Sequence, residues 1–222
     1  MKLALALVIA LAACGSSKPG PVISNTTPAT TAPVAVAIVF NGAEIWVGNE
    51  EHESEAAAQY PGALNGLRTA LAEQPPADAL PAGSQGLVIS YGEGATIRMP
   101  LGPIAGLTPD ALGKQADYRS RFGSDLVAGV MLGVSELSKA TPARRLLIVI
   151  GDGNDTNNDA AHQALAATKQ AAQDANIEVV ALVYKSAVSA DGQVIDALTP
   201  NVQTVSSAAA FSAVFATLWQ RR

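Results

Sequence analysis

Three continuous apolar segments of strand length constrain the fold of this chain more than any other feature. Nearly every position in them is aliphatic, without the alternation of apolar and polar residues that a half-exposed strand shows. They are residues 34–40 (VAVAIVF), 145–150 (RLLIVI) and 177–184 (IEVVALVY). Each is therefore predicted to be a strand buried on both faces, and such strands occur in parallel sheets covered by helices.

Segments with helical periodicity lie between these strands. They are residues 60–74, about 124–137, about 158–175 and 211–219. Pro75-Pro76 should end the first, and Ser124 is expected to cap the second. Two further runs, residues 87–91 and 95–99, are joined by Gly92-Glu93-Gly94 and predict a hairpin. The order of elements predicts an α/β fold: a doubly wound, mostly parallel sheet with one antiparallel edge strand and helices on both faces.

The first residues have the pattern of a secretion signal. Lys2 precedes an apolar run of eleven residues, 3–13, which is too short for a helix that crosses a hydrocarbon core of about 30 Å. Leu11-Ala12-Ala13-Cys14 resembles the lipobox of bacterial lipoproteins, in which the cysteine carries lipid. Residues 1–13 are therefore predicted to be a signal peptide, and Cys14 the attachment site of acyl chains such as palmitate.

A linker is predicted to follow the lipid. Of the nineteen residues 15–33, fourteen are Gly, Ser, Thr, Asn or Pro, which leaves too little apolar surface to offset the entropy of ordering. Cys14 and this linker form segment 14–33, and residues 34–222 form the folded domain. Gly15 after the cysteine favours the outer membrane under the sorting rule of related bacterial lipoproteins, on its periplasmic or its surface face.

The charge and the cysteine count exclude several classes of protein. Nineteen acidic and fourteen basic residues give a net charge of −5, the wrong sign for a protein that binds nucleic acid by neutralising phosphates. A single cysteine excludes an internal disulfide and a cysteine-rich metal site. Membrane attachment is expected through the lipid anchor rather than through surface charge.

The loop after the second apolar strand is the strongest candidate for function. Within residues 152–159 stand three aspartates and three asparagines. Ligands of open α/β sheets bind at the carboxyl ends of the strands, and this loop begins at such an end. Asp152, Asn154 and Asp155 are therefore candidate binding residues.

Two segments resemble the von Willebrand factor A (vWA, or integrin I-like) domain. The run ARRLLIVIGDGNDTNN is similar to that family's fourth strand and the Asp-Gly that follows it, and Gly123-Ser124-Asp125-Leu126 is similar to its Gly-Thr-x-Leu helix start. Residues 205–218 match the closing helix. The resemblance covers about residues 34–222 and implies the fold of that family.

The resemblance also implies a metal-ion-dependent adhesion site that has degenerated. The family uses Asp-x-Ser-x-Ser after the first strand, a Thr in the second loop and an Asp in the third. Asp152 stands at the third place and Ser124, a hydroxyl in place of Thr, at the second. The first motif fails, because residues 41–45 read Asn-Gly-Ala-Glu-Ile. Ser124 and Asp152 remain as candidate ligands of Mg²⁺ or Ca²⁺.

The glutamates of the loop after the first strand leave two alternatives open. Glu50 and Glu51 could approach Asp152 and Asp155 and complete a cation site, or they could form a solvated acidic loop. With Asp125 they would form the rim of a binding face.

The expected function is binding rather than catalysis. The resemblance implies a lipid-anchored envelope protein that binds another, unidentified protein at the carboxyl edge of its sheet. The alternative is a periplasmic domain that binds a cation or a small molecule. A hydrolase triad of Ser90, Asp152 and His162 has a suitable chain order, but residues 88–92 (VISYG) lack the first glycine of a nucleophile elbow, so no enzyme is predicted.

Overall fold

The computed structural model describes residues 32–42, 63–113, 124–183, 194–205 and 207–220. Six strands in these ranges form one sheet of order β3-β2-β1-β4-β5-β6. They are β1 (Val34–Asn41), β2 (Gln85–Gly92), β3 (Gly94–Pro103), β4 (Arg144–Gly151), β5 (Ile177–Val183) and β6 (Val202–Thr204). Only the β2–β3 pair is antiparallel. The predicted fold class, with its hairpin and its antiparallel edge strand, is confirmed.

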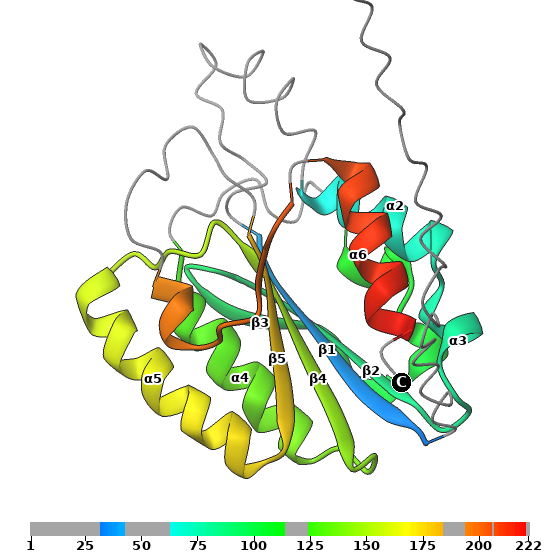
Figure 1. Cartoon of the computed structure of the whole chain (residues 1–222), viewed down its shortest axis with the longest axis horizontal. Coiled ribbons are helices and arrows are strands. Elements are labelled where there is room, and N and C mark those ends of the chain that lie inside the picture. The colour runs from blue at the N-terminus through cyan, green and yellow to red at the C-terminus, as the bar shows by residue number, and fades with distance from the viewer. Residues whose placement is uncertain (1–31, 43–62, 114–123, 184–193, 206, 221–222) are drawn as a thin grey trace, which may run out of the picture.

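Helices cover both faces of the sheet. One face carries α2 (Ala63–Glu73), α3 (Pro76–Ala79) and α6 (Ala208–Gln220), and the other carries α4 (Leu126–Ser138) and α5 (Asn158–Asp174) (Figure 1). Short 3-10 turns occupy Ile104–Gly106, Pro109–Leu112 and Val194–Ala197. None of the described helices is both long and apolar enough to cross a membrane.

Strand β1 shows why a continuous apolar run was the correct signal. Its side chains alternate between two cores, so Ile38 and Phe40 pack with α2 and α6 while Ala37 and Val39 pack with α4 and α5. All eight of its residues are buried. A strand with helices on both sides has no polar face, which explains the absence of alternation.

The elements differ from the prediction in several places, and α6 begins at Ala208, three residues before the predicted start at 211. The cap of α4 is Asp125 and not Ser124, because the Asp125 carboxylate accepts a hydrogen bond from the Ala128 amide at 3.0 Å. Pro76 does follow the end of α2, but it also begins α3, where the missing N–H costs nothing. Strand β6 was not predicted, since three residues are too few to show a period.

Candidate functional site

The carboxyl ends of the central strands meet at one edge of the sheet. Asn41 of β1 is paired with Tyr91 of β2, and Phe40 is paired with Ile150, the residue before Gly151 of β4. The segments that precede α4 and follow β4 join this edge. We call this the carboxyl edge and define it by Asn41, Ser124, Asp125 and residues 152–159.

Ser124 is the residue that joins these segments. Its hydroxyl accepts a hydrogen bond from Asn41 Nδ2 at 3.2 Å and donates one to the backbone oxygen of Asn154 at 2.9 Å. Its backbone N–H donates to Thr156 Oγ1 at 2.8 Å, and its carbonyl accepts from the Thr156 amide at 2.7 Å. The end of β1, the start of α4 and the loop after β4 are thus tied through one residue.

Asp152 folds the loop after β4 back on itself. Its Oδ1 accepts from the Asn154 amide at 2.9 Å and its Oδ2 accepts from Asn154 Nδ2 at 3.2 Å. Asp152 and Asn154 are both half-buried. The structure therefore places Ser124, Asp152 and Asn154 in one hydrogen-bond network.

Asp125 and Asp155 both bind the amino end of α4. Asp125 caps the helix at Ala128, while Asp155 Oδ2 accepts from the Val127 amide at 3.1 Å. The other oxygen of Asp155 accepts from the Asn157 amide at 3.0 Å. Carboxylates are favoured there by the helix dipole and by amides that lack partners within the helix. The sequence predicted these residues as a binding rim, and the structure gives them a structural role as well.

Tyr91, which is paired with Asn41 at the end of β2, is a residue that sequence reasoning missed. Its side chain is 2% exposed, and its hydroxyl donates to the Ile150 carbonyl at 3.3 Å. A β-carbon on Gly129 would lie 2.9 Å from Tyr91 Cβ, and one on Gly151 would overlap the phenol oxygen. Both glycines are distant from Tyr91 in the sequence, so no local pattern indicates this packing.

The remaining residues singled out in the sequence are either outside the described ranges or in other parts of the fold. Glu50, Glu51 and Cys14 fall outside the described residues. Ser90 is buried in β2, where its hydroxyl accepts from Arg98 Nε at 2.7 Å. Its neighbour Tyr91 packs on the face covered by α5, so Ser90 points to the opposite face from the helix that carries His162. Because Ser90 and the helix that carries His162 lie on opposite faces of the sheet, this placement disfavours a catalytic triad that includes both residues.

The side chains at the carboxyl edge do not fit a divalent cation of the family's kind. Asn41 directs an N–H at Ser124, where a ligand oxygen would be needed, and the Ser124 hydrogen points to Asn154. Asp125 and Asp155 bind backbone amides, and no group of three His, Cys, Asp or Glu within the described ranges could hold a metal. Mg²⁺ requires about six oxygens in near-octahedral geometry. Binding of Mg²⁺ or Ca²⁺ at Ser124 and Asp152 stays a prediction.

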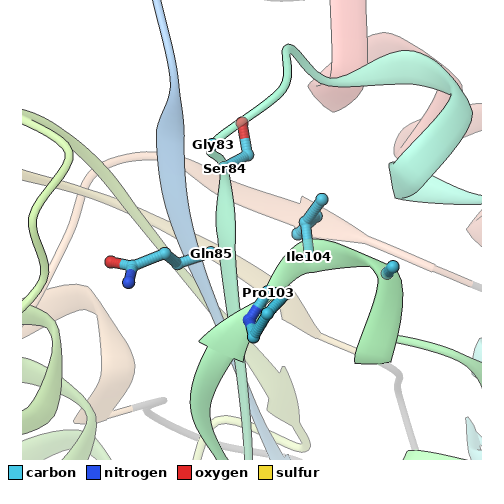
Figure 2. A pocket seen from close by; sticks show the side chains of 6 residues that line it. Gly83, Ser84, Gln85, Pro103 and Ile104 are labelled. Atoms are coloured by element: carbon cyan, nitrogen blue, oxygen red, sulfur yellow. The ribbon is translucent and has the colours of Figure 1, made fainter.

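A separate hollow of about 280 Å³ lies at the opposite end of β2. It is lined by Gly83, Ser84, Gln85, Pro103, Ile104 and Ala105, and Figure 2 shows Gln85 directed away from Ile104. The Ser84 hydroxyl accepts from the Val34 amide at 3.1 Å, and the Gln85 side-chain oxygen accepts from the Thr141 amide at 3.1 Å. These hydrogen bonds connect the start of β2 to the start of β1 and to the segment before β4. None of the residues that line the hollow is charged.

Solved structures share the fold of this chain over most of its length. A von Willebrand factor type A protein from Catenulispora acidiphila superimposes with a TM-score of 0.59 over 86% of this chain, at 15% identity. The vWF domain of the type V pili tip protein Mfa5 from Porphyromonas gingivalis gives 0.59 over 87% of this chain and 98% of its own length, at 11% identity. This chain has the fold of von Willebrand factor A domains.

A third solved structure is also similar to this chain. The PilB minor pilin from Streptococcus sanguinis gives a TM-score of 0.63 at 11% identity, over 86% of this chain and 61% of the pilin. The chain spans only 42% of the Catenulispora protein. No sequence-family model matches the chain, and a search of curated proteins finds no match. The likeness at these identities concerns the fold, and it confirms the resemblance seen in the sequence.

Proposed function

We propose that the vWA-like domain binds another protein through its carboxyl edge and is held in the bacterial envelope by a lipid on Cys14. The observation that carries the proposal is the hydrogen-bond network of Ser124, which fixes three separate segments in one arrangement. A surface whose loops are already ordered loses less conformational entropy when a partner binds.

Two of the structural neighbours support a role in protein assembly. One is the vWF domain of a pilus tip protein and the other is a minor pilin. Carried over to this chain, such a role would make the domain an adhesion module or a scaffold of an envelope complex. The partner remains to be identified, and nucleic acid is disfavoured by the net charge of −5.

The path of β1 supports the use of this edge. The strand begins at Val34, directly after the predicted linker, and ends at Asn41 on the carboxyl edge. Its eight residues span about 26 Å at roughly 3.3 Å per residue. A linker fixed at Cys14 would thus join the domain at the end opposite the carboxyl edge, and that edge would stay accessible.

A pair of charge reversals on one helix tests the proposal. Asp159 belongs to the carboxyl edge and is exposed in the first turn of α5, and Asp174 is exposed in the last turn of the same helix. The full chain is immobilised and used to capture proteins from envelope extract, with and without a chelator. Asp159→Arg should lose a partner that wild type and Asp174→Arg retain. A partner lost equally from both variants, or no specific partner, would contradict binding at this edge.

The chelator separates this proposal from the alternative of a cation-dependent periplasmic domain. Because the described side chains do not fit a divalent cation, the partner should be retained in chelator. A partner that is captured only with Mg²⁺ or Ca²⁺ present would favour a cation site completed by residues beyond those described.

A further inference from the structure

Asn41 connects the end of β1 to the hydrogen-bond network of the carboxyl edge. It stands at the end of β1, where the resemblance places the aspartate that opens the metal motif. Asparagine has nearly the shape of aspartate but carries an N–H donor where the carboxylate has an oxygen. In this chain that donor points at the Ser124 hydroxyl, 3.2 Å away.

We propose that the hydrogen bonds from Asn41 to Ser124 and from Ser124 to Asn154 replace the divalent cation of an intact site and keep the carboxyl edge ordered without a metal. A cation in such a site joins three loops because each supplies it with an oxygen. Here Ser124 joins the same three segments directly, by accepting from Asn41 and donating to Asn154. The inference rests on the fold and on this geometry, not on the identity of a partner.

The charge balance of the network agrees with a site that works without a metal. The Asp152 carboxylate receives two N–H groups of Asn154, at 2.9 and 3.2 Å. Hydrogen bonds of this kind stabilise an ionised carboxylate without a counter-ion. A cation near Ser124 would face the Asn41 N–H and would have to displace it from the hydroxyl.

The neighbouring carboxylates are engaged elsewhere. Asp125 and Asp155 accept hydrogen bonds from the Ala128 and Val127 amides at 3.0 and 3.1 Å, and these contacts hold the first turn of α4. Recruiting either oxygen to a cation would break a helix cap, which opposes binding. The network and the caps therefore engage these carboxylates without added charge, whereas the buried side-chain oxygen of Asn154 has no hydrogen-bond partner among the described residues.

Thermal melting of the full chain in detergent, followed by circular dichroism, tests the inference. The protein is first stripped with a chelator and then titrated with Mg²⁺, Mn²⁺ or Ca²⁺ to about 10 mM, above the dissociation constants of about 1 mM that weak calcium sites show. The wild-type melting temperature should not change. A rise of several degrees with any of these ions would overturn the inference.

Two substitutions probe the network itself, and Ser135 provides the matched control. Ser124→Ala removes both hydrogen bonds and should lower the melting temperature by about 2–5 °C, whereas Ser135→Ala, on the exposed side of α4, should leave it unchanged. Equal melting of the two variants would overturn the inference.

The second substitution is Asn41→Asp, which removes the donor and adds a carboxylate beside the Ser124 hydroxyl. Without cation this variant should melt below wild type, and Mg²⁺ or Mn²⁺ should raise its melting temperature. A variant that melts like wild type in chelator would contradict the role given to Asn41. Melting needs no partner, so this experiment can fail independently of the capture experiment.

Discussion

The hydroxyl end of the Tyr91 side chain occupies the space that a side chain on Gly151 would need, across the end of β1. Tyr91 belongs to β2 and Gly151 to β4, and β1 runs between these two strands. The Tyr91 hydroxyl donates to the Ile150 carbonyl at 3.3 Å, and a methyl group on Gly151 would overlap that hydroxyl. Position 151 therefore accepts no side chain while Tyr91 is present, and the ring supports the carboxyl edge from within.

Gly151→Ala should lower the free energy of unfolding by about 1–3 kcal/mol, because the added methyl overpacks a filled site. Tyr91→Phe alone should cost about 0.5–1.5 kcal/mol through the lost hydrogen bond. With the hydroxyl removed, the nearest ring atom would be 3.3 Å from the new methyl, a tight but tolerable distance. The double variant should thus be more stable than the two single effects predict.

Urea denaturation of the four proteins measures this coupling. Strict additivity of the two changes would show that the methyl group and the hydroxyl do not meet, and would contradict the packing of Tyr91 on Gly151.

Arg145 connects the carboxyl ends of the two helices on one face of the sheet. One guanidinium nitrogen donates to the Ala175 carbonyl at 2.7 Å, after α5, and the other donates to the Ala140 carbonyl at 3.1 Å, after α4. Arg145→Met should destabilise the domain by about 2–4 kcal/mol, because each hydrogen bond from a charged group contributes about 1.5–3 kcal/mol and water will partly replace them.

The Arg145→Lys variant tests the geometry of this contact. An ammonium group lacks the planar fork and should hold only one of the two carbonyls, so its stability should fall between those of wild type and Arg145→Met. Lys139→Met is the control, since Lys139 makes only an exposed pair with Glu136. Equal midpoints in urea for Arg145→Met and Lys139→Met would refute the connecting role.

The strands could be predicted from the sequence because burial on both faces leaves a direct trace in residue type. Val34 to Phe40 is apolar throughout for that reason. The cap of α4 was misassigned because serine and aspartate are both good caps and stand next to each other at 124 and 125. Only the backbone geometry decides which side chain reaches the Ala128 amide.

The site was predicted in part. Topology brings the two together, because the Asp152 loop follows the carboxyl end of β4 and Ser124 precedes α4, the helix that leads back to the start of β4. The role of Asn41 was missed because a search for metal ligands rejects an amide there, whereas a hydrogen-bond network requires one. Tyr91 was missed because its partners, Gly129 and Gly151, are distant in sequence and carry no side chain.

Asp155 should be more important for stability than its partial exposure implies. It binds the Val127 amide of α4 and the Asn157 amide before α5, so it couples the starts of two helices. Asp155→Ala should cost about 1–2 kcal/mol, the usual loss for a removed cap. Hydrogen exchange at Val127 and Asn157 should accelerate together, while Asp174→Ala should change neither the exchange nor the stability. Faster exchange at only one of the two amides would refute the coupling.

The predicted lipid anchor can be tested at Cys14 without any knowledge of the partner. Bacteria that express the full chain are grown with an alkyne analogue of palmitate, and labelled protein is detected after conjugation to a dye. Wild type should be labelled and should lack residues 1–13 by mass spectrometry. Cys14→Ser should be unlabelled and should retain those residues, because a hydroxyl does not replace the thiol in lipid attachment.

The double variant Cys14→Ser, Ser16→Cys shows whether sequence context or the mere presence of a thiol determines the labelling. Its cysteine no longer follows Leu11-Ala12-Ala13 directly, so it should remain unlabelled. Label on this variant, or label retained on Cys14→Ser, would mean that the acyl chain is attached independently of the lipobox-like pattern. The carboxyl edge would then need another explanation for how it is held in the envelope.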